Sequence, residues 1–198
     1  MMNENYAHPP MLEGTRDGIL RGLYQLRDAQ DQSAPRVQLL GSGSILREVL
    51  AAADLLRDEF GVHADVWSAT SFTELRRDGL DVERWNLLHP GEPPRRSFVE
   101  EQLGGRPGPV IAATDWVKAY ADQIRPFVSA PYRVLGTDGF GRSDRREGLR
   151  HFFEVNRFFV AVAALKSLAD AGVVPRATVS QAIERFKIDP AKPNPMRS

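Results

Sequence analysis

The side chains best suited to chemistry lie in one short segment, where carboxylate, guanidinium and hydroxyl groups alternate with glycine. The segment consists of Asp138, Gly139, Phe140, Gly141, Arg142, Ser143 and Asp144. The apolar residues 132–135 precede it and predict a strand, so the segment is expected at the carboxyl end of a strand, where open α/β sheets bind ligands. A loop of this composition would face the active cleft of a neighbouring domain.

The same segment also suits a purely structural turn. Its glycines allow positive φ, and its aspartate oxygens can cap backbone N–H groups, with Arg142 then pairing with Asp144. Glycine–aspartate turns usually do structural work, so we favour the turn and keep the cleft or interface loop as the open alternative.

A Gly-Ser-Gly turn at residues 41–43 is the second candidate, between an apolar stretch at 37–40 and a helical pattern. A dinucleotide fingerprint needs a third glycine three residues on, where this chain has Leu46. The Gly41 turn can still hold an anion at a helix N-terminus, which keeps a small nucleotide-binding protein as one functional class. A tight strand-to-helix turn is the simpler interpretation.

No catalytic, cofactor-binding or metal-binding residue is predicted in this chain. The histidines are widely separated and follow no metal-ligand spacing, and no nucleophile elbow or Walker glycine loop is present. Cysteine is absent, which removes disulfides and thiolate chemistry. The four histidines are His8, His63, His89 and His151.

Composition excludes several classes of partner. The 26 basic and 26 acidic side chains cancel, so nothing favours nucleic acid or an anionic membrane. Residues 1–14 are polar and do not resemble a signal peptide, and the longest apolar run, 158–165, is far shorter than the roughly 20 residues of a membrane span. We therefore expect a soluble, cytoplasmic protein.

Strand and helix signals alternate along the chain, which implies an α/β layer structure with a mostly parallel sheet. Residues 17–26 fit a strand or a short helix equally well. Residues 62–69 alternate apolar and polar side chains, which predicts a strand. The expected strands are 37–40, 62–69, 110–114 and 132–135.

Helix signals are clearest after Ser44, where apolar side chains share one face until Gly61 supplies a stop. Ser71 and Glu74 predict a capping box before a short helix, and Asp115 is expected to cap another. Further helices are expected at 81–88, between 94 and 104, after Asp144, at 156–171 and after Pro175.

The helix at 156–171 is apolar almost all round and is therefore expected to be buried or to form an interface. Trp67, Trp85 and Trp116 add large aromatic surface, which is typical of cores and interfaces. Together these features favour an interface. The tail 189–198 contains three prolines and is expected to be loose.

Seven strings of residues, in order along the chain, resemble one known family. The strings are MNENY (2–6), GILRGLY (18–24), VQLLGSGSILR (37–47), TSFTEL (70–75), ERWN (83–86), GTDGFGRSD (136–144) and FEV (153–155). They resemble the last domain of the homodimeric bacterial pyruvate dehydrogenase, the thiamine-dependent, acetyl-transferring component of the transketolase-like superfamily. One departure is Asn156, where the family usually has Asp; both side chains cap helices about equally well.

The resemblance implies a three-layer α/β/α fold with a mixed, mostly parallel five-stranded sheet whose first strand is antiparallel. It favours a strand over a helix for residues 17–26. The implied organisation is a linker from a missing upstream domain at 1–16, a transketolase C-terminal-like domain at 17–190 and a tail at 191–198.

The resemblance also implies that the reactive groups lie elsewhere. In the family, thiamine diphosphate and magnesium lie between upstream domains and use a Gly-Asp-Gly motif followed by paired asparagines. Residues 137–139 read Thr-Asp-Gly, and no Asn-Asn pair occurs. The full-length enzyme decarboxylates pyruvate oxidatively and acetylates lipoyl groups, whereas this piece is expected to bind no cofactor itself.

The implied role of this piece is structural, as a dimer contact and one wall of the active cleft. The implied partners are the upstream thiamine-binding domains, a second copy of the enzyme and the dihydrolipoyl acetyltransferase component. A freestanding interaction or regulatory module of the same fold is the alternative.

Overall fold

A computed structural model describes residues 10–29, 31 and 33–198. Its centre is a five-stranded sheet with the strand order β1-β3-β2-β4-β5. β1 runs antiparallel to β3, and the other neighbouring pairs are parallel. This confirms the mixed sheet with an antiparallel first strand. The strands are β1 (Leu23–Arg27), β2 (Arg36–Gly41), β3 (His63–Ala69), β4 (Val110–Ala113) and β5 (Tyr132–Leu135).

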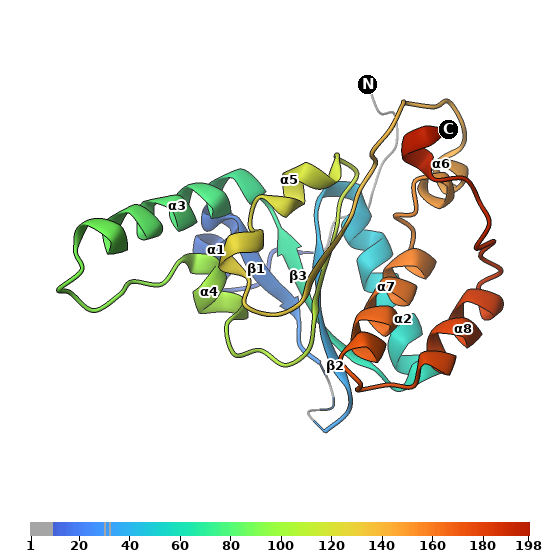
Figure 1. The fold of residues 1–198 in the computed structure, drawn as a ribbon, viewed down its shortest axis with the longest axis horizontal. Helices are drawn as coiled ribbons and strands as arrows, with labels where there is room; N and C mark the ends of the chain where they lie inside the picture. The colour runs from blue at the N-terminus through green and yellow to red at the C-terminus, as the bar shows by residue number, and fades with distance from the viewer. Residues whose placement is uncertain (1–9, 30, 32) are drawn as a thin grey trace.

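Helices cover both faces of the sheet and make three layers (Figure 1). Each face has its own cluster of buried apolar side chains, so the sheet is covered on both sides, as parallel sheets require. The three-layer α/β/α prediction is confirmed. One face carries α2 (Leu46–Phe60), α7 (Arg157–Asp170) and α8 (Arg176–Arg185), and the other carries α3 (Phe72–Leu88), α4 (Phe98–Leu103) and α5 (Lys118–Asp122).

The first helix of the α2 layer forms as its sequence predicts. A short 3-10 turn, Gly43–Ile45, leads into it, and its buried face includes Val49, Ala52 and Leu56. Gly61 ends it in the left-handed conformation, with φ +62°, and its N–H bonds back to the last turn.

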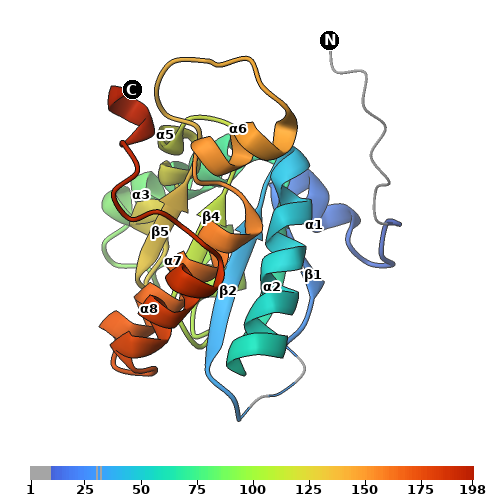
Figure 2. The same ribbon diagram turned by 90° about the vertical axis from the view of Figure 1, so that its right-hand side faces the viewer.

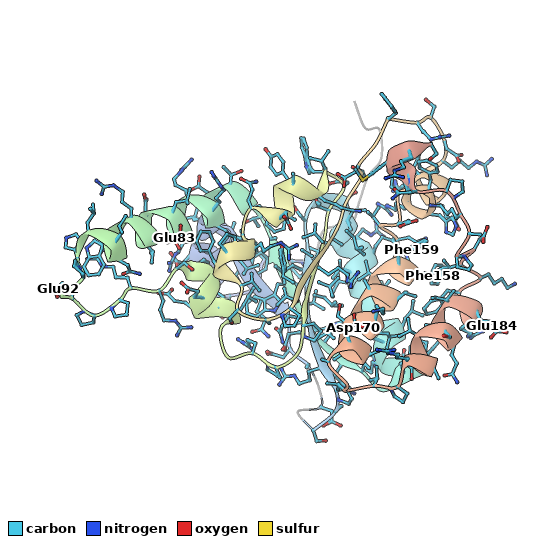
Figure 3. All side chains as sticks on the ribbon, viewed as in Figure 1. Glu83, Glu92, Phe158, Phe159, Asp170 and Glu184 are labelled. Carbon is cyan, nitrogen blue, oxygen red and sulfur yellow. The ribbon has the colours of Figure 1, made fainter. Side chains whose placement is uncertain are left out.

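The apolar helix α7 is buried within the chain. Asn156 caps it, because its side-chain oxygen accepts hydrogen bonds from the N–H groups of Phe158 and Phe159. Most of its apolar side chains lie in the core, while these two phenylalanines are half-buried at its start (Figure 3). Of the two expected environments, burial is the one observed.

Residues 17–26 are not one strand. They begin with helix α1 (Arg16–Arg21), turn at Gly22 and continue as β1. Gly22 has φ +102°, and a Cβ there would come within 2.5 Å of the Ser71 carbonyl oxygen. Because only glycine fits this left-handed conformation without a clash, Gly22 ends the helix and allows the strand to begin at the next residue.

The two short helices expected after Ser71 are a single helix, α3, which projects from the body of the molecule (Figure 1). The Ser71 hydroxyl accepts a hydrogen bond from the Glu74 N–H, but the Ser71 N–H donates to Gly22. The predicted reciprocal capping box is therefore wrong here. A complete box forms instead between Ser97 and Glu100, at the start of α4.

The strand predicted at 62–69 is confirmed as β3, but its polar side chains Asp65 and Ser68 are buried although they alternate with apolar ones. Asp65 is fully buried, and its carboxylate accepts hydrogen bonds from Arg36, Gln38 and the Ala29 N–H. Polar side chains of β3 therefore point into the interior and find partners there, as buried charge requires.

The expected loose tail is packed. Lys192 donates hydrogen bonds to the Phe152 carbonyl and to Glu154, and Pro195 is buried in the turn Pro195–Arg197. The end of the chain thus lies against the end of α6 (Arg146–Phe152), and Pro195 also lies against Gly139 of the loop that follows β5. Figure 2 shows this loop arching between the end of β5 and α6.

Candidate functional site

Three loops meet at the carboxyl edge of the sheet. In the ladder, Gly41 pairs with Ala113, which pairs with Leu135, so β2, β4 and β5 end in line. The loops that follow them are residues 42–44, 114–117 and 136–144. This is the edge at which open α/β sheets bind ligands, and we call it the carboxyl edge.

Asp138 uses its carboxylate for structure. One oxygen accepts a hydrogen bond from the Lys118 N–H at 2.9 Å, and the other lies 3.9 Å from the Lys118 Nζ. Asp138 therefore caps α5, the role that the sequence assigned to Asp115. The prediction for Asp115 is wrong, because Val117 occupies the N-cap position of α5 and the Asp115 carboxylate binds Ser44 instead.

Asp115 instead joins the first two loops. Its carboxylate accepts a hydrogen bond from the Ser44 hydroxyl at 3.1 Å and lies about 3.2 Å from where a Cβ on Gly43 would stand. Its carbonyl accepts from the Thr137 hydroxyl at 2.7 Å. These contacts hold the three loops together and place a negative charge beside the Gly41 turn. An anion at that turn would meet this charge, which argues against the nucleotide hypothesis.

The remaining loop residues do not converge on a shared site. The Arg142 guanidinium lies 4.2 Å from the Phe152 ring centroid, so its predicted pairing with Asp144 is wrong. The Asp144 carboxylate accepts a hydrogen bond from the Arg145 N–H at 2.6 Å. Gly139 lies against Pro195 of the tail, and a Cβ on Gly141 would meet nothing within 4 Å. Ser143 is exposed.

The loops at the carboxyl edge expose large aromatic side chains. Phe140 is 82% exposed, and Trp116 on the adjacent loop is 60% exposed and stacks on Tyr120 at 5.3 Å. Of the other tryptophans, Trp67 is buried in the core, while Trp85 is sandwiched between His89 and Arg95 on the arm of α3.

The described histidines lie apart from the carboxyl-edge loops. The His63 ring accepts a hydrogen bond from a backbone N–H, His89 stacks on Trp85, and His151 lies edge-on to Phe159. His8 and the string 2–6 are outside the described residues. Among the residues that the structure describes, no group of three acidic or histidine side chains has metal-binding geometry.

The carboxyl edge does not fit thiamine diphosphate and magnesium. Magnesium needs carboxylate or amide oxygens free to coordinate it, but Asp115 and Asp138 already bind Ser44 and Lys118. A diphosphate needs converging donors, and the acidic Asp115 stands beside the Gly41 turn. No step of thiamine chemistry can be derived from these residues.

One cluster was missed from the sequence. Glu48 is only 5% exposed and accepts hydrogen bonds from Arg150 and Arg157 at 3.0 to 3.1 Å. Glu48 lies between Ile45 and Ala52 on the apolar face of α2, and this position in the sequence could have indicated a buried carboxylate. A carboxylate on a buried face requires a cationic partner, and the sequence does not reveal which arginine supplies it.

A mixed, mostly parallel sheet covered by helices on both faces defines a three-layer α/β/α domain. Residues 22–156 match the family described as the Transketolase-like TK C-terminal domain, and the chain belongs to that family. In solved structures, a Pichia stipitis transketolase in complex with sedoheptulose-7-phosphate aligns over 82% of this chain and 20% of its own, with a TM-score of 0.53 and 20% identity. That likeness concerns the fold.

Comparison with curated proteins identifies relatives that are more similar in sequence. The chain is 60% identical over 197 residues to the pyruvate dehydrogenase E1 component of Cupriavidus necator, and 52% identical over 195 residues to that of Escherichia coli K12. These alignments cover 99% and 98% of this chain and 22% of each relative. The chain therefore matches the C-terminal region of that component and spans about a fifth of its length.

The described residues contain no helix with the length and apolar character needed to cross a membrane.

Proposed function

We propose that this chain is the C-terminal domain of a pyruvate dehydrogenase E1 component and that it contributes contact surface rather than reactive groups. The observation that supports the proposal most strongly is that the carboxyl edge exposes aromatic side chains while its aspartates are hydrogen-bonded within the chain. Asp115 and Asp138 are bound to groups of this chain, whereas Trp116 and Phe140 remain exposed.

Exposed aromatic side chains support a contact role. Trp116, Val117 and Tyr120 are exposed at the start of α5, where the rings of Trp116 and Tyr120 stack, and we call these three residues the α5 patch. Large aromatic residues are enriched in protein interfaces because they bury much area and keep a polar group for the rim. In the full-length enzyme the α5 patch would meet the upstream thiamine-binding domains or the second subunit.

The wider role follows from the family. The complete enzyme would be a cytoplasmic homodimer that uses thiamine diphosphate and magnesium to decarboxylate pyruvate and to acetylate the lipoyl groups of the dihydrolipoyl acetyltransferase component. In this proposal, the present domain forms one wall of the active cleft and part of the dimer contact.

Complementation tests the proposal. An E1 component truncated before this domain is mixed with the 198-residue chain, and decarboxylation of pyruvate is measured. The wild-type chain should restore activity, and a Trp116→Ala/Tyr120→Ala variant should restore much less. Leu87→Ala is the matched control, because Leu87 is 77% exposed near the far end of α3, away from the α5 patch. Figure 3 labels Glu83 in this helix and Glu92 in the loop that follows it.

Equal restoration by the wild-type chain and the aromatic variant would contradict the role of the α5 patch. Failure of the wild-type chain to bind the truncated enzyme would favour the freestanding module. Gene context gives an independent check, since an adjacent reading frame that encodes the Gly-Asp-Gly motif supports a divided enzyme.

A further inference from the structure

A groove of about 840 Å³ lies beside the carboxyl edge, between α6, the start of α7 and Glu48 of α2. It is separate from the α5 patch, and none of its lining residues belongs to the candidate loop except Asp144. Its volume suits a small molecule. Four arginines line it, namely Arg145, Arg146, Arg150 and Arg157.

Hydrogen bonds to Glu48 organise the floor of the groove. Both carboxylate oxygens of Glu48 accept hydrogen bonds, one from Arg150 and Arg157 together and the other from the Arg157 side chain and N–H. Glu48 is buried beneath these two guanidinium groups, so a single negative charge holds two positive ones in place. Guanidinium groups fixed in this way lose little entropy when they bind an anion.

The rim adds further positive charge. Arg145 is exposed, and Arg146 stands one helical turn before Arg150. Because Arg146 and Arg150 lie one turn apart on α6, their like charges are close together. Burial lowers the pKa of Arg146, and the positive charge of Arg150 lowers it further. An anion in the groove would relieve this repulsion.

The arginines that line the groove outnumber the carboxylates that line it. Besides Glu48, these carboxylates are Asp144 and Glu147. Asp144 accepts a hydrogen bond from the Arg145 N–H, and Glu147 acts on Arg157, where its charge raises the arginine pKa after the larger contribution of Glu48. Four arginines thus face three carboxylates, although the whole chain has no net charge.

We propose that this arginine groove binds a small phosphate-bearing molecule, with phosphoryl oxygens held by Arg145 and Arg146 at its rim. Arg150 already donates to Glu48 and Ser44 and contributes positive charge beneath these two rim arginines. The planar guanidinium fork matches phosphate geometry and forms paired, charge-assisted hydrogen bonds. The site does not depend on the E1 role, because it uses only residues of this chain.

Titration of the ¹⁵N-labelled 198-residue chain tests the proposal. The probes are inorganic phosphate, pyrophosphate and glycerol 2-phosphate, at constant ionic strength set with chloride. Saturable amide shifts are expected around α6 and the start of α7. Pyrophosphate binding tighter than glycerol 2-phosphate would identify free diphosphate as the preferred form, and the reverse order would identify an organic ester.

The variant Arg145→Ala/Arg146→Ala should bind the preferred probe roughly tenfold more weakly. Arg76→Ala/Arg77→Ala, on exposed positions of α3, is the matched control and should bind as the wild type does. Circular dichroism of each variant shows whether the fold is kept, and Arg145→Lys provides a milder second variant.

Three results would overturn the proposal: shifts that grow linearly without saturation, equal affinity in the Arg145/Arg146 variant, or saturable binding of an acidic peptide but of none of the phosphates.

Discussion

The carboxylate of Asp138 accepts a hydrogen bond at 2.9 Å from the backbone N–H of Lys118, which lies 20 residues earlier in the chain. This contact ties the loop after β5 to the start of α5 and so positions the α5 patch. Asp138→Ala should destabilise the domain by about 1 kcal/mol, as other lost helix caps do. Asp138→Asn keeps an oxygen acceptor and should cost less. Urea denaturation of the two variants measures the change in unfolding free energy. An Asp138→Ala variant as stable as the wild type would mean that the capping hydrogen bond contributes little to stability.

Gly79 is the point where α3 rests on Phe127. A Cβ at this glycine would come within 2.4 Å of the buried ring. Gly79→Ala should therefore be destabilising overall, because overpacking costs about 1–3 kcal/mol and exceeds the gain of up to ~1 kcal/mol in helix propensity. Thermal or urea unfolding measures the difference.

Gly91→Ala serves as the comparison for this position, since a Cβ there would meet nothing within 4 Å. Its stability should stay within about 0.5 kcal/mol of the wild type. Adding Phe127→Leu to Gly79→Ala should recover part of the loss, as expected for residues in contact. A stabilised Gly79→Ala would contradict the close approach.

Two glycines in the 136–144 loop should respond differently to the same substitution. Gly139 has φ +110°, and its Cβ would lie 2.5 Å from the Pro195 carbonyl oxygen, whereas Gly141 faces open space. Gly139→Ala should displace the tail and raise amide hydrogen exchange in the loop, while Gly141→Ala should leave exchange unchanged. Similar exchange in both variants would show that the tail does not hold the loop.

Glu48 should make stability depend on pH in the acid range. Burial alone would raise the pKa of Glu48, but hydrogen bonds from Arg157 and the charges of Arg157 and Arg150 outweigh it and hold the pKa below its ordinary value. Because the folded state then binds the proton less readily than the unfolded state, the stabilisation is complete above a pH of about 4.3 and is lost as the pH falls through the folded pKa.

Glu48→Gln should cost about 1.5–3 kcal/mol at neutral pH, because hydrogen bonds to a charged group are lost. The unfolding free energy of the variant should also fall less than that of the wild type when the pH is lowered below the ordinary carboxylate pKa. Urea unfolding at neutral and acid pH gives both quantities. A variant that shows the wild-type pH profile would rule out Glu48 as the responsible group.

Local patterns were enough to predict much of this fold. The apolar face of α2, the stop at Gly61 and the cap at Asn156 are set by residues close together in sequence, and all three are observed. Errors arose where a distant partner decides the outcome. Ser71 gives its N–H to Gly22 instead of to Glu74, and Asp138 takes the capping role expected of Asp115.

The site was predicted less completely for the same reason. The structural interpretation of the aspartates in the loop was correct for Asp138, but the partner of Arg142 is an aromatic ring rather than a carboxylate. Glu48 meets arginines about 100 residues further along the chain, and only the folded arrangement identifies them.

We propose that this domain contributes contact surface to a thiamine-dependent enzyme and contains none of the residues that bind the coenzyme. Calorimetric titration of the 198-residue chain with thiamine diphosphate in the presence of magnesium tests this claim most directly. We expect thiamine diphosphate with magnesium to bind no more tightly than pyrophosphate alone binds to the arginine groove. Micromolar, magnesium-dependent binding of thiamine diphosphate would contradict it.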